Sequence, residues 1–132
     1  QHQNVRAENG KQYGDLPQFV DYVYLRRVAQ VNAAIVAETA SAPAPPVNVH
    51  IVGDLSATTT LLWDASPEAV AGYEILIRRT TAPDWERTVS VDANAKRAAL
   101  AFSKDDYLFA VRAVGKNGAR GLPVVPVAAV GR

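Results

Sequence analysis

The sequence has no cysteine, no methionine and no long uninterrupted apolar run. The absence of cysteine excludes disulfides, thiolate metal sites and a cysteine nucleophile. A bilayer span needs about 18 to 20 consecutive apolar residues, so the sequence predicts no membrane span. Because the chain has no methionine and begins with Gln1, we expect it to be a processed piece or fragment of a longer protein.

An excess of charge of one sign is also lacking. The 132 residues include 14 Lys and Arg against 13 Asp and Glu, so no basic surface for nucleic acid is predicted. Apolar residues make up 48% of the chain and charged residues 20%, which is typical of a globular protein. Since domains commonly contain ~100 to 150 residues, the chain has room for one domain and a short appendage.

The first forty residues combine a polar segment with a helical pattern. Residues 1–18 are polar and contain turn-forming pairs such as Asn9-Gly10, which predicts an extended loop with turns. From Asp21 onward, apolar residues recur at steps of three and four, which predicts a helix with Asp21 as its N-cap. The apolar stripe consists of Val20, Tyr24, Val28, Val31 and Ile35. One helix cannot bury its own stripe, so we expect the following domain or an absent domain to cover it.

Residues 41–46 contain three prolines, which prevent helix formation and favour polyproline II. Such a segment would form a semi-rigid spacer of roughly 19 Å. The sequence therefore predicts three parts. Residues 1–40 hold the loop and helix, residues 41–46 the linker, and residues 47–132 a separate domain.

After the linker, seven short segments of alternating or β-branched residues lie between turn signals. They are residues 47–52, 57–64, 73–77, 85–91, 98–100, 107–113 and 122–130. Asn117-Gly118 predicts a turn between the last two, and Pro123 and Pro126 confine the last strand to an edge or a bulge. The pattern predicts a mainly β fold, a seven-stranded β-sandwich preceded by one amphipathic α-helix.

Alternation along the strands also predicts a contact surface. With Tyr73 and Tyr107 facing inward, neighbouring strands would send three apolar side chains outward, with two arginines at their margin. The predicted interface consists of Leu76, Leu108, Ala110, Arg78 and Arg112. An apolar patch with a charged rim is typical of a protein contact, here with the helix, a missing domain or a peptide.

No residue is predicted to be catalytic. The acidic pair Asp105-Asp106 lies in a predicted turn, where aspartate bonds local backbone, and Asp84 with Glu86 lacks a pocket that would separate two pKa values. His50 is interpreted as an exposed side chain of an edge strand. The chain has only two histidines, the other being His2.

The strand region carries several residues in a familiar order. They are Pro46, Leu61-x-Trp63, Pro67, Gly72-Tyr73, Tyr107, Val111-Arg112-Ala113-Val114 and Asn117-Gly118. Residues from about 45 to 130 therefore resemble a fibronectin type III domain, which belongs to the immunoglobulin-like sandwiches. The resemblance implies that Trp63, Tyr73 and Tyr107 form the structural core. It also implies that the Tyr107 hydroxyl bonds to nearby backbone.

The first forty residues resemble the C-terminal end of zinc metallopeptidases of the M28 aminopeptidase family. The matching residues are Gln1 to Arg6, Glu8-Asn9-Gly10, Tyr13-Gly14-Asp15, Phe19-Val20-Asp21 and Arg27-Val28-x-x-Val31-Asn32-Ala33-Ala34. This resemblance implies a parent enzyme with a zinc pair, exported from the cell, and His2 is the only residue placed to match a metal ligand. A zinc site usually needs about three or four protein groups, so no cofactor is expected in this chain itself.

We therefore expect a non-catalytic C-terminal fragment of such a peptidase. Its sandwich would serve in interdomain packing against the missing peptidase domain, or in positioning substrate or a surface. A second interpretation is a free-standing module that binds a protein or polysaccharide through its loops or sheet edge. A third is self-association through the helix stripe.

Overall fold

The structure is a computed structural model that describes residues 2–128. The chain forms two compact units, Gln1–Ala37 and Glu38–Arg132. The boundary falls inside the helix α1, Tyr22–Ser41, whose last four residues belong to the second unit. In the described part of the chain, no helix is both long and apolar enough to cross a membrane.

The first unit begins with a β-hairpin, where the sequence predicted an extended loop. Strands β1, Arg6–Glu8, and β2, Lys11–Tyr13, pair antiparallel. Asn9 and Gly10 join them with φ angles of 51° and 75°, and an Asn-Gly pair favours such left-handed two-residue turns. A short 3-10 helix, Pro17–Phe19, follows. The loop prediction was therefore wrong for these two strands, although it placed a turn at Asn9-Gly10.

Helix α1 begins as the sequence predicted. Asp21 Oδ1 accepts hydrogen bonds from the main-chain N–H groups of Val23 and Tyr24, each at 3.0 Å, so the predicted N-cap is confirmed. The apolar stripe on α1 is exposed, and its least exposed member, Val28, still shows 37% of its surface.

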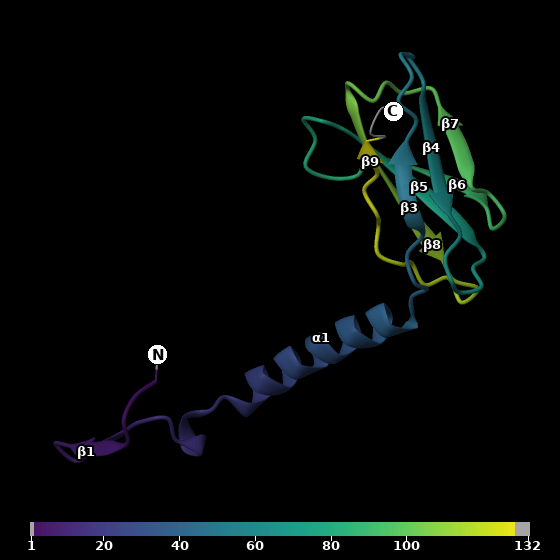
Figure 1. Cartoon of the computed structure of the whole chain (residues 1–132). Helices are drawn as coiled ribbons and strands as arrows, with labels where there is room; N and C mark the ends of the chain where they lie inside the picture. Colours follow the sequence, from purple (N-terminus) through teal and green to yellow (C-terminus); the bar gives the residue numbers. More distant parts are fainter. Residues whose placement is uncertain (1, 129–132) are drawn as a thin grey trace. The chain divides into compact units, whose positions relative to one another are not determined.

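The second unit is a β-sandwich, as predicted (Figure 1). In the described residues its seven strands are β3 Val47–Ile51, β4 Thr59–Asp64, β5 Gly72–Arg79, β6 Arg87–Asp92, β7 Arg97–Leu100, β8 Tyr107–Val114 and β9 Val127–Ala128. One sheet has the order β7-β4-β3-β9 and the other β6-β5-β8. The predicted last strand, residues 122–130, begins only at Val127 in the structure, and its positions 129 and 130 lie outside the described residues.

The chain after β8 passes from one sheet to the other. Val124 exchanges two main-chain hydrogen bonds of 2.9 Å with Val111 of β8. Three residues later, β9 pairs parallel with β3 through Val127 and His50. Pro126 lies between the two pairings and has no N–H for a ladder, which accounts for the break.

The core lies between the two sheets. Trp63 and Tyr73 are 2% and 1% exposed, and their rings meet edge to face with centroids 5.7 Å apart. Tyr107 is only partly buried and packs edge-on against Phe102. Among the described residues, Tyr73 rather than Tyr107 bonds backbone through its hydroxyl, accepting the N–H of Ser66 at 2.9 Å. Tyr107 lies at the start of its strand, where its ring packs on Phe102.

The proline-rich segment, residues 41–46, packs on the sandwich and belongs to the second unit. Pro43 and Pro46 are buried, and the main chain of Ala44 is hydrogen-bonded to sandwich side chains. The expected extended spacer is therefore, in the structure, part of the sandwich unit.

Candidate functional site

The structure pairs His2 with a carboxylate in the first unit. His2 Nδ1 lies 2.8 Å from Asp15 Oδ2, across the turn-rich segment that also holds the hairpin. The imidazole is otherwise fully exposed. Histidines that bind metals commonly bond a carboxylate through the ring nitrogen that does not face the metal. Sequence reasoning selected His2 but missed Asp15, because no pattern indicates which acid the chain brings to it.

No group of three His, Cys, Asp or Glu side chains that could hold a metal occurs within residues 2–128. His2 and Asp15 alone supply one nitrogen and one carboxylate, which is fewer ligands than zinc usually takes from protein. The residues present do not fit a complete zinc site in this chain.

The predicted interface is largely covered. Leu76 and Ala110 face each other on β5 and β8, outside the main core cluster, but are only 2% and 0% exposed. Leu108 alone of the three apolar side chains is substantially exposed, at 37%. The prediction of an open apolar patch was therefore wrong. Alternation identifies the face of a sheet on which a side chain lies, but it does not show whether that face is open to solvent.

The two predicted rim arginines make specific contacts on the same face. The guanidinium of Arg78 lies 5.6 Å from the centroid of the Trp85 ring and donates to the carbonyl oxygen of Ala82. Arg112 pairs with Glu74, the residue opposite it on β5. Both arginines are therefore engaged within the sandwich.

Glu74 is the centre of an ionic cluster that sequence reasoning missed. The residue is 8% exposed, and its carboxylate accepts hydrogen bonds from Arg112 Nε at 2.7 Å and from Arg120 Nε at 3.2 Å. The cluster joins β5, β8 and the segment after the Asn117-Gly118 turn. A glutamate inside the mostly apolar run 73–77 indicates an acid that needs a partner. The sequence does not identify that partner, because it depends on the register between strands.

Burial on its own would raise the pKa of Glu74. The hydrogen bonds and positive charges of Arg112, followed by those of Arg120, outweigh that effect and hold the pKa below its ordinary value of 4.5. Glu74 is therefore ionised at neutral pH, and the cluster carries one net positive charge. Its arrangement indicates a structural ion pair rather than a proton-transfer site.

The other candidate groups lie in local structures. Asp105 and Asp106 donate their main-chain N–H groups to Ser103, at 3.2 Å each, within a turn. His50 Nδ1 lies 2.7 Å from the carbonyl oxygen of Asn48 on the same strand, β3. The contacts of Asp105, Asp106 and His50 described here are with nearby main chain or with Ser103, and none of them is with another acid or base.

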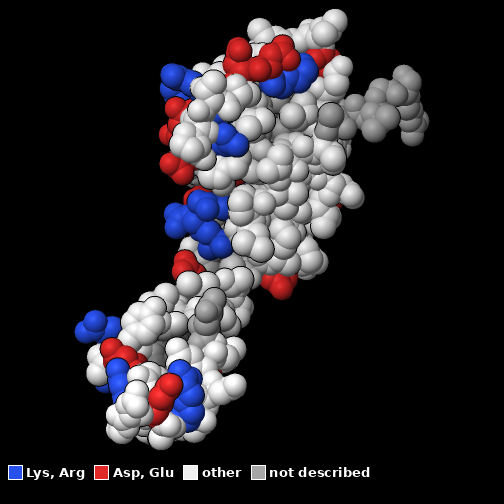
Figure 2. Space-filling view, turned by 90° about the vertical axis from the view of Figure 1, so that its left-hand side faces the viewer, with Lys and Arg blue, Asp and Glu red and all other residues white. Residues whose placement is uncertain are grey.

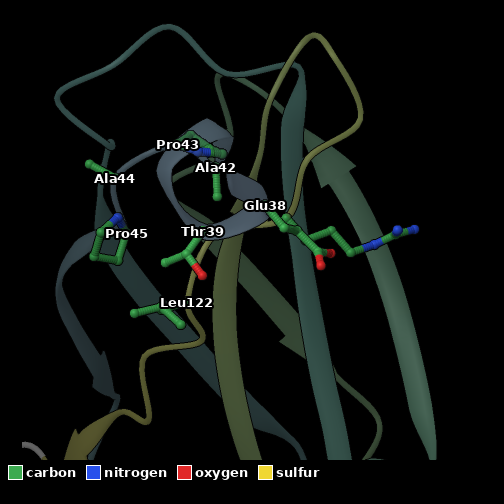
Figure 3. Close-up of a pocket in the computed structure, with 8 residues that line it drawn as sticks. Glu38, Thr39, Ala42, Pro43, Ala44, Pro45 and Leu122 are labelled. Atoms are coloured by element: carbon green, nitrogen blue, oxygen red, sulfur yellow. The ribbon is translucent and has the colours of Figure 1, made fainter. Parts of the chain in front are cut away.

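A cavity of about 320 Å³ lies beside the proline-rich segment. Its lining consists of Glu38, Thr39, Ala42, Pro43, Ala44, Pro45, Arg120 and Leu122. Figure 3 shows Glu38 at the opposite end of this cavity from Ala44 and Pro45. None of the site residues predicted from sequence lines it. The lining is mostly apolar and brings no acid–base pair or nucleophile to a reactive arrangement.

Exposed apolar side chains are concentrated on the last segment of the sandwich. Leu122, Val125 and Val127 are 66%, 62% and 70% exposed. Figure 2 shows one face of the sandwich with a broad area that carries no charged side chain. Sequence reasoning missed this segment as a surface feature because Pro123 and Pro126 identified it only as an edge.

The chain is similar along nearly its whole length to fungal proteins named as probable zinc metalloproteases. One from Pyrenophora tritici-repentis is 42% identical over 132 residues, covering 96% of this chain and 30% of the relative. One from Leptosphaeria maculans is 42% identical, with the same two coverages. One from Pyricularia oryzae is 41% identical, covering 96% and 26%. The chain thus spans less than a third of these relatives. No model of a known protein family matches it.

Solved structures resemble the sandwich. A Fn3-like protein from Clostridium thermocellum aligns with a TM-score of 0.52 and 25% identity, covering 67% of this chain and 93% of that one. An FN3 domain of human collagen XX aligns with a TM-score of 0.51 and 24% identity, covering 64% and 90%. The sandwich has a fibronectin type III-like fold. This likeness concerns the fold and carries no information on activity.

Proposed function

We propose that this chain is the C-terminal, non-catalytic part of a zinc-dependent aminopeptidase of the M28 type. The fibronectin type III-like sandwich serves in interdomain packing or in positioning substrate or a surface. The similarity to probable zinc metalloproteases over 96% of the chain supports a metallopeptidase parent. The M28 assignment and the aminopeptidase activity rest on the sequence resemblance of the first forty residues.

The observation that carries this proposal is the absence of a core in the first unit. None of residues 2–37 is buried, although this stretch contains a hairpin, a 3-10 helix and most of a twenty-residue helix. Val5, Phe19 and Tyr24 are 63%, 57% and 67% exposed. Elements with so much exposed apolar surface need a partner that covers them. A peptidase domain that shares its core with these elements would supply that surface.

His2 and Asp15 give this proposal a specific site. In the parent enzyme, His2 would be one zinc ligand, and the Asp15 carboxylate beside its Nδ1 would orient the ring. Zinc would there supply Lewis acidity toward the peptide carbonyl and lower the pKa of a bound water. The other ligands and the catalytic base would come from the peptidase domain. Export from the cell is part of the same proposal and follows from the resemblance alone.

The test compares this chain with the longer protein encoded by the same gene. Zinc is measured by atomic emission, and turnover with an aminoacyl 4-nitroanilide and with its N-acetylated counterpart. We expect the longer protein to contain zinc and to cleave only the substrate with a free amino group. This chain should do neither. Stoichiometric zinc with turnover in this chain, or a longer protein without zinc, would overturn the proposal.

A variant sharpens the test at the metal. His2→Gln in the longer protein should lower its zinc content and its activity together, whereas His50→Gln, on β3 of the sandwich, should change neither. Cleavage of the acetylated substrate would keep a metallopeptidase parent but exclude an aminopeptidase.

A further inference from the structure

Two loops of the sandwich hold the main chain of residues 41–46. From the loop 65–71, Glu68 Oε2 accepts the N–H of Ala44 at 3.0 Å, and Ser66 Oγ donates to the carbonyl oxygen of Ala44 at 2.7 Å. From the loop 115–121, Asn117 Nδ2 donates to the carbonyl oxygen of Ser41 at 3.2 Å. The proline-rich segment is thus bound by side chains from two separate loops.

The donors and acceptors of the loops match a proline-rich ligand. Residues 43–46 are Pro-Ala-Pro-Pro, so this stretch has a single main-chain N–H, that of Ala44. Glu68 accepts that one donor, while Ser66 donates to the carbonyl oxygen of the same residue. Both main-chain polar groups of Ala44 are therefore bonded to loop side chains.

The shape of the site fits the segment as closely as its polar groups do. A Cβ added at Gly121 would lie 2.6 Å from the carbonyl oxygen of Pro43, so only glycine allows this approach. A Cβ at Gly115 would lie 3.4 Å from the Pro43 ring. The Pro43 and Pro46 rings are buried. The sandwich thus shields Pro43 and Pro46 from water, whereas Pro45 between them stays exposed.

The loop 65–71 is itself fixed from the core. The N–H of Ser66 donates to the hydroxyl of the buried Tyr73 at 2.9 Å, and Ser66 Oγ accepts the N–H of Glu68 at 3.3 Å. Ser66 is 8% exposed. The groups that bind Ala44 are therefore positioned by the sandwich itself and not only by the segment.

We propose that the loops 65–71 and 115–121 form a binding site for a proline-rich peptide segment, and that the segment 41–46 of this same chain occupies it. The site is thereby closed to external partners unless the segment leaves it. This inference is independent of the proposed peptidase parent.

Ala44 provides a direct reporter, because it is the only residue of 43–46 with an amide N–H. Amide hydrogen exchange is measured by NMR on the full 132-residue chain. We expect the Ala44 amide to be protected, and Glu68→Ala to speed its exchange by at least about tenfold, since a hydrogen bond to a charged acceptor is lost. Glu68→Gln keeps an acceptor and should have a smaller effect. Ser66→Ala should resemble Glu68→Ala, and Ser66→Thr should retain protection.

The Ile75 amide in β5 serves as the folding control and should keep its protection in every variant. An Ala44 amide that exchanges as fast as in an unstructured peptide, while Ile75 is protected, would overturn the proposal. So would equal protection of Ala44 in the original chain and in Glu68→Ala.

A second experiment tests whether the site binds in trans. In the full chain, residues 43–46 are replaced by Gly-Ser-Gly-Ser, and a synthetic peptide of residues 39–48 is added. The amides of Ser66, Glu68 and Asn117 should shift on addition of peptide to this variant and should not shift in the original chain. No shift in the variant, with Ile75 still protected, would contradict a binding site. Should the variant not fold, the Glu68 and Ser66 substitutions decide the question.

Discussion

The hydroxyl of Tyr73 accepts a hydrogen bond from the main-chain N–H of Ser66 at 2.9 Å, and both residues are buried. Tyr73 belongs to the centre of the core, whereas Ser66 belongs to the loop that binds Ala44. A single hydroxyl thus joins the packing of the sandwich to the position of the proline-rich segment.

Substituting Tyr73→Phe removes this hydroxyl and leaves the Ser66 N–H buried without a partner. We expect a loss of about 1 to 3 kcal/mol in the free energy of unfolding, measured by urea denaturation followed by tryptophan fluorescence. Tyr107→Phe is the matched control and should cost less than about 0.5 kcal/mol, because the Tyr107 ring packs on Phe102 without it. Equal losses in the two variants would show that the Tyr73 hydroxyl has no special role.

Substituting Trp63→Ala should cost ~3 to 5 kcal/mol, because the indole fills the centre of the core. Trp63 is 2% exposed and lies among Leu61, Tyr73 and other buried side chains. Trp85→Ala provides the comparison, since Trp85 is 37% exposed and should cost far less. Urea denaturation followed by circular dichroism measures both. A loss below about 1 kcal/mol for Trp63→Ala would contradict its central position.

The sequence predicts the fold correctly where a local pattern of residues is itself what forms the local structure. Alternating apolar residues indicated the sandwich strands, because their inward faces fill one core. Asn117-Gly118 indicated a turn, in which Gly118 has a φ of 81° and Asn117 Oδ1 accepts the N–H of Ala119. Asp21 indicated a helix start because its side chain caps free N–H groups.

The hairpin of β1 and β2 could not be predicted as readily. Its strands have three residues each, with the sequences Arg-Ala-Glu and Lys-Gln-Tyr, and neither shows an apolar face. The contacts that accompany the turn are between polar or charged side chains, such as Arg6 over the Tyr13 ring at 4.7 Å. Alternation of apolar residues carries no information on such a hairpin.

The candidate site was predicted only in part, because burial and register are properties of the assembled sheet. Alternation placed Leu76 and Ala110 on the outer face, but it could not show that they are covered. The ion pair of Glu74 with Arg112 requires β5 and β8 to align residue against residue. Arg120 reaches the same carboxylate only after the chain has turned at Asn117-Gly118.

The two arginines of this cluster should differ in their contribution to stability. Arg112→Met should cost about 1 to 3 kcal/mol in urea denaturation at pH 7, because it leaves a buried carboxylate short of its closest partner at 2.6 Å. Arg120→Met should cost less than about 1 kcal/mol, since the Arg120 side chain is 57% exposed and solvent screens its charge. A larger effect for Arg120 would show that the segment after the turn, rather than the strand pair, depends on Glu74.

The stability of the sandwich should fall in acid through Glu74. The pKa of Glu74 in the folded chain lies below the ordinary value of 4.5, so the folded state holds this proton less tightly than the unfolded state. The stabilisation is therefore fully present well above pH 4.5 and is lost as the pH falls below 4.5 toward the folded pKa.

Glu74→Gln, which cannot titrate, is the reference. The difference in unfolding free energy between the original chain and Glu74→Gln should be constant from pH 6 to 8 and should shift against the original chain below pH 4.5. A difference that is independent of pH, or that favours the original chain more strongly in acid, would show that the two arginines do not lower the pKa of Glu74.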